Sequence, residues 1–280
     1  MRKKLLLGLP FMITAVIIWG YQTIFTLSDT PQLTTIESHS ELPSLNCYHN
    51  PAPVSIDESG VINLLVWNIY KQNRDNWQQA LEQYSTNKQL VLLQEASMTS
   101  ELKQWIAQRG WNGNQVDAFK AFDVSAGVLN LAPELPVKAC AYTELEPWLR
   151  LPKSALYATY QLSDGQQLAV VNIHGVNFTY GTTEYQRQLD SLVAALNEHT
   201  GPIIVAGDFN SWSEQRLQVL KQALSGLKLT EVKFSPDHRV EFVTGLPLDH
   251  VFYKGLSLKT AEAPVSDASD HNPLLVQFSL

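Results

Sequence analysis

From Val61 to the C-terminus, short apolar runs alternate with longer amphipathic segments. The short runs predict β-strands: VINLLVW, LVLLQ, QLAVVNIH, PIIVAGD and LDHVFY. Four other segments place apolar residues three and four positions apart, which is the spacing of an amphipathic helix: DNWQQALEQY, SELKQWIAQ, EYQRQLDSLVAALNEH and EQRLQVLKQAL. Strands interleaved with helices predict an α/β layer architecture.

The N-terminus differs, because residues 5–25 form an uncharged, mostly apolar run after the basic start Met-Arg-Lys-Lys. About 20 apolar residues span a bilayer as a helix, and basic residues before such a run favour a cytoplasmic N-terminus. A cleaved signal peptide fits less well, because the run is longer than a usual signal core and no A-x-A-like site follows it. We therefore predict a single, uncleaved transmembrane helix, with the rest of the chain on the non-cytoplasmic side of the membrane.

These patterns divide the chain into three parts. Residues 1–27 are the predicted membrane anchor. Residues 28–60 are rich in Ser, Thr, Pro and Glu without a sustained period, which predicts a tether and an irregular lead-in. Residues 61–280 contain no internal linker, repeat or low-complexity tract, so we expect one domain there.

Composition and charge restrict the function. The chain is 45% hydrophobic and 17% charged, as expected for a globular protein with a sizeable core. Its net charge is −7, but residues 1–27 hold three basic residues and no acid, so the remainder has 17 Lys/Arg against 27 Asp/Glu, a net charge of −10. An acidic domain binds duplex phosphates poorly by charge alone. A bound divalent cation reverses the sign locally, so a phosphate substrate is still compatible with this charge.

The two cysteines, Cys47 and Cys140, lack the close spacing of a zinc site or a redox pair. If the domain is exported, a structural disulfide between them and two unrelated buried thiols are equally compatible with the sequence.

The most informative feature is that the predicted strands end in polar residues that a core would not select. Such strand ends meet at one rim of an α/β sheet, where ligand sites form. A helix cap near Trp212 would explain Asp208 or Asn210 alone, but not all six strand ends. Hard oxygens hold Mg²⁺, amides and histidines contact phosphate, and a carboxylate or His moves a proton, so this set indicates metal-assisted phosphoryl chemistry. The residues are Asn68, Glu95, His174 with Asn177, Asp208 with Asn210, Asp249, and Asp270 with His271.

Six motifs in this order resemble the endonuclease/exonuclease/phosphatase superfamily, which includes deoxyribonuclease I, exonuclease III-type repair endonucleases, bacterial sphingomyelinases and inositol-polyphosphate phosphatases. The resemblance covers nearly all of residues 61–280. It implies an α/β fold, a four-layer α-β-β-α sandwich with two central mixed sheets. The motifs are WNIY (67–70), QEA (94–96), NIHGVN (172–177), GDFNS (207–211), LDHVFY (248–253) and SDHNP (269–273).

The resemblance also implies roles for the motif residues. Glu95 is similar to the principal metal ligand of the family, with Asn68 and Asp270 close to it. The implied metal is Mg²⁺, with Mn²⁺ or Ca²⁺ as alternatives. Asp208 and Asn210 resemble the pair that positions the attacking water and the phosphate.

Two histidines resemble catalytic groups. His271 resembles the catalytic histidine of the family, with Asp249 bound to its second ring nitrogen, an arrangement that fixes the tautomer and favours imidazolium. DNase-like and sphingomyelinase-like members have a histidine at the position of His174, whereas a structural, hydrogen-bonded histidine is the alternative there. His250 follows Asp249 directly and should point to the opposite face of its strand, so we leave it out of the site.

Three further positions are candidates for substrate binding. Asn177 lies just beyond the strand that ends in His174. Arg150 and Lys153, in WLRLPKSA, form either a phosphate clamp or a solvated loop. DNase-like members also support the first histidine with a Glu on a neighbouring strand, but the corresponding run here, SAGVLNL, has no acid, which leaves the orientation of His174 open.

The sequence therefore predicts a monomeric, membrane-anchored, metal-dependent phosphodiesterase in which water attacks phosphorus in line. The general base is open between Asp208 and His271. The DNase-like histidine pair makes nucleic acid the first substrate, and a phospholipid head group is the second, favoured by the tether and the acidic surface. A non-catalytic anchored binding module is the third hypothesis. It requires a gap among the main site positions, and the sequence has none.

Overall fold

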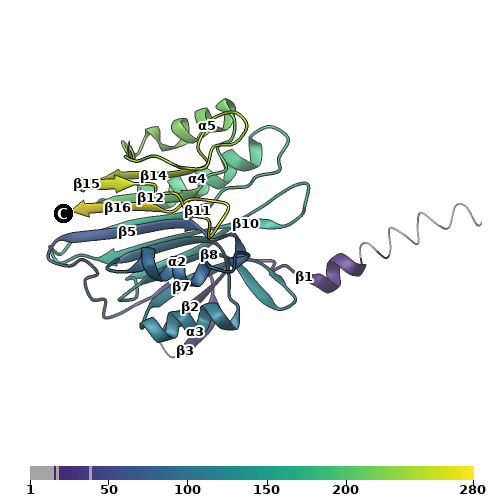
Figure 1. Ribbon diagram of the computed structural model, residues 1–280, viewed down its shortest axis with the longest axis horizontal. Coiled ribbons are helices and arrows are strands. Elements are labelled where there is room, and N and C mark those ends of the chain that lie inside the picture. Colours follow the sequence, from purple (N-terminus) through teal and green to yellow (C-terminus); the bar gives the residue numbers. More distant parts are fainter. Residues whose placement is uncertain (1–15, 17–18, 38–39) are drawn as a thin grey trace, which may run out of the picture.

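Two β-sheets form the centre of the molecule. The computed structural model describes residues 16, 19–37 and 40–280 (Figure 1). The strands of the first sheet are β1 (Phe25–Thr26), β2 (Gln32–Glu37), β3 (Ser40–Leu45), β5 (Val61–Asn68), β6 (Leu90–Ser97), β7 (Asn112–Ala121), β8 (Val124–Ala132), β15 (Ser257–Glu262) and β16 (Leu274–Ser279). Those of the second are β4 (Cys47–His49), β9 (Lys138–Leu145), β10 (Pro152–Gln161), β11 (Gln167–His174), β12 (Ile203–Asp208), β13 (Thr230–Glu231) and β14 (Asp249–Lys254).

Both sheets are mixed. The first has the order β15-β16-β5-β6-β8-β7-β2-β3, with β1 paired to β7, and the second has the order β13-β14-β12-β11-β10-β9-β4. Within each sheet one central pair is parallel, β5 with β6 and β11 with β12, and the other pairs between these strands are antiparallel. The alternation of strand and helix along the chain produces these parallel pairs, because each needs a crossover helix.

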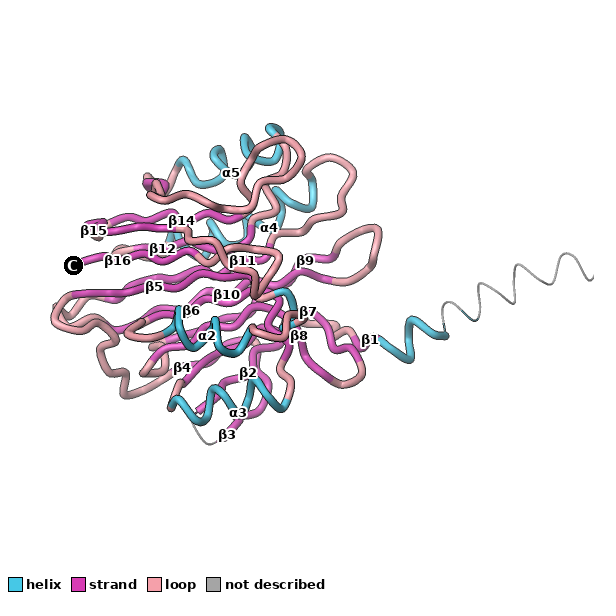
Figure 2. Tube along the Cα trace, viewed as in Figure 1, coloured by secondary structure: helices cyan, strands magenta, loops and turns pink. Residues whose placement is uncertain are grey.

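Helices cover the outer face of each sheet, as Figures 1 and 2 show, so the molecule is an α/β sandwich of four layers. Helices α2 (Trp77–Ser85) and α3 (Ser100–Arg109) pack on the first sheet, and α4 (Thr183–Asn197) and α5 (Glu214–Ser225) pack on the second. Three apolar cores separate the layers, one between the sheets and one under each helix pair. The two mixed sheets expected from the family resemblance are therefore present.

The expected membrane anchor is corrected by the structure, and with it the predicted membrane localisation. Within the described residues no helix is long and apolar enough to cross a membrane. Most of the predicted span, residues 5–25, lies outside the described residues. Its described end contacts the domain, because the Tyr21 hydroxyl donates to the Arg150 carbonyl at 2.9 Å and Phe25–Thr26 pairs with β7. The described end of the apolar run, at Tyr21 and Phe25–Thr26, is therefore in contact with the sandwich.

Residues 28–60 contribute strands to both sheets. In the first sheet β2 pairs with β7, and in the second β4 pairs with β9. The register of the second pair places Cys47 directly opposite Cys140, and the two form a disulfide with a Cα–Cα distance of 4.1 Å. The pairing that the sequence left open is therefore present and joins this segment to the second sheet.

The fold brings the carboxyl ends of the two parallel pairs to one end of the sandwich. In the first sheet Asn68 lies beside Gln94, and in the second His174 lies beside Asp208. Gly207 permits the close approach of β12 to β11, because its φ is 139° and a Cβ there would lie 2.1 Å from the Ile173 carbonyl oxygen. No other residue type accommodates this contact without moving the backbone that carries Asp208.

Candidate active site

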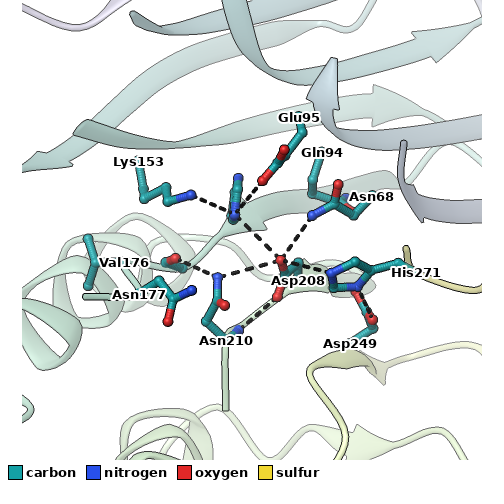
Figure 3. Close-up of polar contacts among 12 residues, drawn as sticks. Asn68, Gln94, Glu95, Lys153, Val176, Asn177, Asp208, Asn210, Asp249 and His271 are labelled. Atoms are coloured by element: carbon teal, nitrogen blue, oxygen red, sulfur yellow. Dashed lines mark hydrogen bonds and ion pairs between the residues drawn. The ribbon is translucent and has the colours of Figure 1, made fainter. Parts of the chain in front are cut away.

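One pocket of about 680 Å³ opens at the rim where these strands end. Figure 3 shows the predicted polar side chains converging there from both sheets. The pocket is lined by nine of the predicted residues, namely Asn68, Glu95, Lys153, His174, Asn177, Asp208, Asn210, Asp270 and His271.

Asp208, at the end of β12, lies at the centre of this cluster and contacts several of its members (Figure 3). Its Oδ2 atom accepts a hydrogen bond from the Asn68 amide at 3.0 Å and lies 3.4 Å from His174 Nε2 and 3.8 Å from His271 Nε2. The Asn210 backbone N–H donates to Oδ1 at 2.9 Å. Burial and the nearby Asp249 carboxylate raise the pKa of Asp208 to about 6, although His271 acts in the opposite direction. Asp208 is therefore poised to exchange a proton near neutral pH.

Asp249 is buried behind His271 and orients its ring (Figure 3). Asp249 Oδ2 lies 2.7 Å from His271 Nδ1, which leaves Nε2 directed toward Asp208. Burial by itself lowers the pKa of His271, but the Asp249 and Asp208 carboxylates outweigh burial and raise that pKa to about 10. His271 is therefore an imidazolium at neutral pH, which carries a positive charge and can donate a hydrogen bond from each ring nitrogen.

His174 has the opposite electrostatics. Its Nε2 lies 3.0 Å from Lys153 Nζ, and because an ammonium only donates, Nε2 accepts and the ring proton is on Nδ1. Burial, followed by the charges of Lys153 and Lys71, lowers the pKa of His174 well below its usual value. The hydrogen-bonding partner of His174 Nε2 is thus a lysine, whose Nζ is in turn 4.0 Å from the buried Glu146.

Glu95, Asn68 and Asp270 present carboxylate and amide groups to the same pocket. Burial raises the pKa of Glu95, but the charges of Lys71 and Lys153 outweigh burial and hold that pKa below its usual value, so the carboxylate is ionised. Two carboxylates and an amide form the hard-oxygen donor set that Mg²⁺ prefers, and this donor set fits a divalent cation.

Within the described part of the chain, Asp208, Asp249 and His271 form a group whose possible ligand atoms lie within 4.8 Å of one another. Asp249 Oδ2 and His271 Nδ1 are 2.7 Å apart and already bond to each other, and the two nearby carboxylates favour the protonated ring. A protonated imidazole has no lone pair for a metal, so we interpret this group as an acid–base cluster.

Two residues considered in the sequence analysis, Arg150 and His250, lie away from the pocket. Arg150 is on the exposed loop between β9 and β10 and does not line the pocket, whereas Lys153 does, so the structure does not bring these two residues together there. His250 faces the other side of β14, where its ring contacts Ser211 at 2.8 Å and Glu231 at 2.7 Å.

Three site residues were not identified from sequence. Lys71 forms an ion pair with Glu95, and the Glu146 carboxylate accepts from the Asn177 backbone N–H at 2.7 Å. Arg216, buried on α5, donates to the Asn210 carbonyl at 2.7 Å and so supports the turn after β12. Of these three residues, Lys71 alone had a sequence feature that could have identified it, because it directly follows the WNIY motif.

The backbone is strained where the site side chains leave their strands. Glu95 has a φ of 54° and lies at a register shift between β6 and β8, and Asn210 has a φ of 48°. A left-handed conformation costs about 1–2 kcal/mol for a residue with a Cβ. Such strain persists where the surrounding structure over-determines it, and it concentrates at functional sites.

Comparison with known proteins agrees with this geometry. The profile of the Endonuclease/Exonuclease/phosphatase family matches residues 65–271. The chain belongs to the endonuclease/exonuclease/phosphatase family. Members of this family are phosphoesterases that commonly use divalent metals. A UPF0294 protein of Vibrio vulnificus is 59% identical over 280 residues, covering 100% of this chain and 99% of the relative. A UPF0294 protein of Yersinia enterocolitica is 45% identical over 228 residues, covering 81% and 87%.

Solved structures share the endonuclease/exonuclease/phosphatase fold at low identity. The human Nocturnin catalytic domain with bound sulfate has a TM-score of 0.62 at 18% identity, covering 79% of this chain and 94% of that one. TDP2 of D. rerio complexed with a single-strand DNA product has a TM-score of 0.56 at 16% identity, covering 79% and 99%. At these identities the likeness extends to the fold alone.

Proposed function

We propose that this protein is a metal-assisted phosphodiesterase in which Asp208 is the general base. The observation that carries the proposal is the convergence of Asn68, His174 and His271 on the buried Asp208 carboxylate. A site of this composition has a group to activate water, groups to bind a phosphate, and carboxylates to hold a cation.

The proton assignments follow from the electrostatics. His271 is already protonated at neutral pH and cannot accept a proton from water, whereas Asp208, with a pKa of about 6, can. We therefore assign His271 to neutralising a phosphate oxygen and Asp208 to removing the proton of the attacking water.

Other residues of the chain bind and orient the substrate. Asn177 and Asn210 line the pocket beside Asp208, and Lys153 adds a positive charge near His174. Glu95, Asn68 and Asp270 are the residues that would hold the metal. When bound, a divalent metal neutralises charge on the phosphate.

The activity should have a bell-shaped pH dependence. We expect kcat/KM to rise as Asp208 ionises near pH 6 and to fall as His271 loses its proton near pH 10. The Asp249 charge raises the pKa of His271 and also that of Asp208, so Asp249→Asn should move both the alkaline limb and the acid limb to lower pH. The measurement is kcat/KM against pH for both proteins. An alkaline limb that does not move in Asp249→Asn would contradict the assignment of His271.

Nucleic acid is the first substrate class to test. Aromatic side chains of Trp148, Phe178 and Trp212 line the pocket, and stacking on aromatic rings is how proteins hold unpaired bases. TDP2, which shares the fold, was crystallised with a single-strand DNA product. A single strand also suits a site with few cationic side chains better than a duplex does.

A phospholipid is the second candidate, and the character of the pocket favours it. Beside the polar cluster the lining is apolar and continues onto loops with exposed large side chains, Trp148, Leu149, Phe178 and Phe242. Lys71 and Lys153 are the lysines of the described lining, with no arginine, so the pocket offers charge for one phosphodiester and apolar surface for the rest of the substrate.

A hydrolysis panel separates these substrates. The full-length protein is assayed on single-stranded DNA, single-stranded RNA, plasmid DNA, sphingomyelin and phosphatidylinositol phosphates, each with Mg²⁺ or EDTA. We expect EDTA-sensitive release from one class. Hydrolysis that EDTA leaves unchanged would refute metal assistance. No hydrolysis of any substrate would refute the phosphodiesterase assignment in favour of a binding module.

A further inference from the structure

Lys71 is the unexplained charged residue of the site. Its Nζ forms an ion pair with Glu95 Oε2, the carboxylate proposed above as a metal ligand. The Lys71 side chain is 41% exposed and that of Glu95 is 16% exposed, and both residues line the pocket. A lysine ammonium and a divalent cation cannot both occupy the same carboxylate oxygen.

The backbone of Lys71 is unusual and firmly held. Tyr70, Lys71 and Gln72 have φ values of 49°, 52° and 56°, three consecutive left-handed residues without a glycine. Residues with a Cβ adopt this conformation singly, not in runs. The turn persists because the structure on both sides of it fixes its position, which is the circumstance in which strain indicates function.

Both ends of this turn are bound to the strands that carry the proposed metal ligands. The Tyr70 backbone N–H donates to Asn68 Oδ1 at 3.1 Å. The Gln72 side chain donates to the Ser97 carbonyl at 3.0 Å and accepts from the Ser97 N–H at 3.2 Å. Lys71 therefore projects from a turn fastened to β5 on one side and to β6 on the other, and Glu95 is within its reach.

The second lysine of the pocket, Lys153, has different partners from Lys71. Its Nζ is 3.0 Å from His174 Nε2, at the end of β11, and 4.0 Å from Glu146 Oε1. Lys153 thus has its own partners, and Lys71 is the lysine that contacts Glu95 directly. A flexible four-carbon stem with three rotatable donors allows a lysine to exchange one anionic partner for another.

We propose that Lys71 is a resident cation of the site that neutralises Glu95 until a divalent metal binds and is then displaced onto the substrate phosphate. Two consequences follow from this exchange and have opposite signs. Removing the Lys71 ammonium frees Glu95 and strengthens metal binding. The same change deprives the metal-loaded site of a phosphate contact and weakens phosphate binding.

The test replaces Lys71 by asparagine, because asparagine tolerates left-handed backbone and so preserves the turn while removing the charge. Mn²⁺ is titrated into the full-length protein by calorimetry, without substrate, and inorganic phosphate is then titrated into the Mn²⁺-saturated protein. We expect Mn²⁺ to bind about fivefold more tightly in Lys71→Asn, the effect of removing one partly exposed ion pair. Phosphate should bind about tenfold more weakly, the effect of losing one charged hydrogen bond.

Lys259→Asn is the matched control, because Lys259 is exposed on the edge strand β15 and its loss changes the net charge equally. The affinities of Lys259→Asn for Mn²⁺ and for phosphate should equal those of the wild type. Thermal unfolding establishes that each variant is folded, and Lys71→Gln repeats the test should the asparagine variant fail to fold. Unchanged Mn²⁺ affinity in a folded Lys71 variant would overturn the proposal.

The inference rests on the proposed function in two respects, the role of Glu95 as a metal ligand and the phosphate as the final destination of the ammonium. The Mn²⁺ titration uses neither substrate nor turnover, so it tests the competition for Glu95 even if the hydrolysis panel fails. Tighter Mn²⁺ binding with unchanged phosphate affinity would overturn the transfer to phosphate.

Discussion

Replacing His271 by alanine is expected to lower kcat and kcat/KM together by about 10²–10³-fold, the cost of removing one group that stabilises charge in the transition state. His271 is held as an imidazolium by Asp249 and Asp208, so its charge acts on the phosphate as negative charge develops. A group that acts mainly on the transition state lowers both constants equally when it is removed. Added Mg²⁺ should restore none of this loss, because His271 is not among the proposed metal ligands.

Two variants make the His271 measurement specific. Asp249→Asn keeps the shape of the side chain and should be milder than His271→Ala, because Asp249 only orients the ring and stabilises its charge. His49→Ala, at an exposed position on β4, controls for the loss of any histidine and should retain full activity. Full activity in His271→Ala, on a substrate that the wild type hydrolyses, would show that the proposed mechanism is wrong even though the fold is right.

The four helices α2 to α5 and the strands β5, β6, β11, β12 and β14 could be predicted because their local signals agree with the fold. The pattern SELKQWIAQ predicted the helix observed as Ser100–Arg109, which begins after a capping Thr99 and ends at Gly110 with a φ of 67°. The polar strand ends were also visible in sequence, because each interrupts an apolar run at its carboxyl end.

The N-terminal part could not be predicted in the same way. An apolar run of this length has the composition of a membrane span, and composition does not reveal that Phe25–Thr26 finds a partner in β7. Likewise the short strands β2 and β4 have little periodicity of their own. They exist because β7 and β9, distant in sequence, offer hydrogen-bonding edges.

The supporting residues of the site were missed for a related reason. Arg216 lies in an amphipathic helix, where an arginine is usually on the solvated face, yet its guanidinium packs 4.0 Å from the centre of the Tyr185 ring. Lys71 reaches Glu95 only because three residues adopt a left-handed turn, and no propensity predicts such a run. Both positions depend on contacts between segments far apart in the chain.

Replacing Glu95 by alanine is expected to reduce activity at low Mg²⁺ by at least about 100-fold, the upper range for losing even an outer-sphere partner of a metal. Unlike the loss in His271→Ala, part of this deficit should return at high Mg²⁺. Glu95 is proposed to bind the metal, so its removal raises the metal concentration needed for half-maximal activity, and excess metal compensates. The measurement is kcat against Mg²⁺ concentration for the wild type, Glu95→Ala and His271→Ala.

Glu95→Gln refines this test, because it keeps one neutral oxygen and the length of the side chain at the same left-handed position. Its half-maximal Mg²⁺ concentration should lie between those of the wild type and Glu95→Ala, since an amide oxygen is a weaker ligand than a carboxylate. Glu262→Gln, on the exposed edge strand β15, removes the same charge far from the proposed ligands and should leave the titration unchanged. If instead Glu95→Ala lowers kcat by the same factor at every Mg²⁺ concentration, Glu95 acts on the substrate and not on the metal. The cation would then have to be held by Asn68 and Asp270 without it.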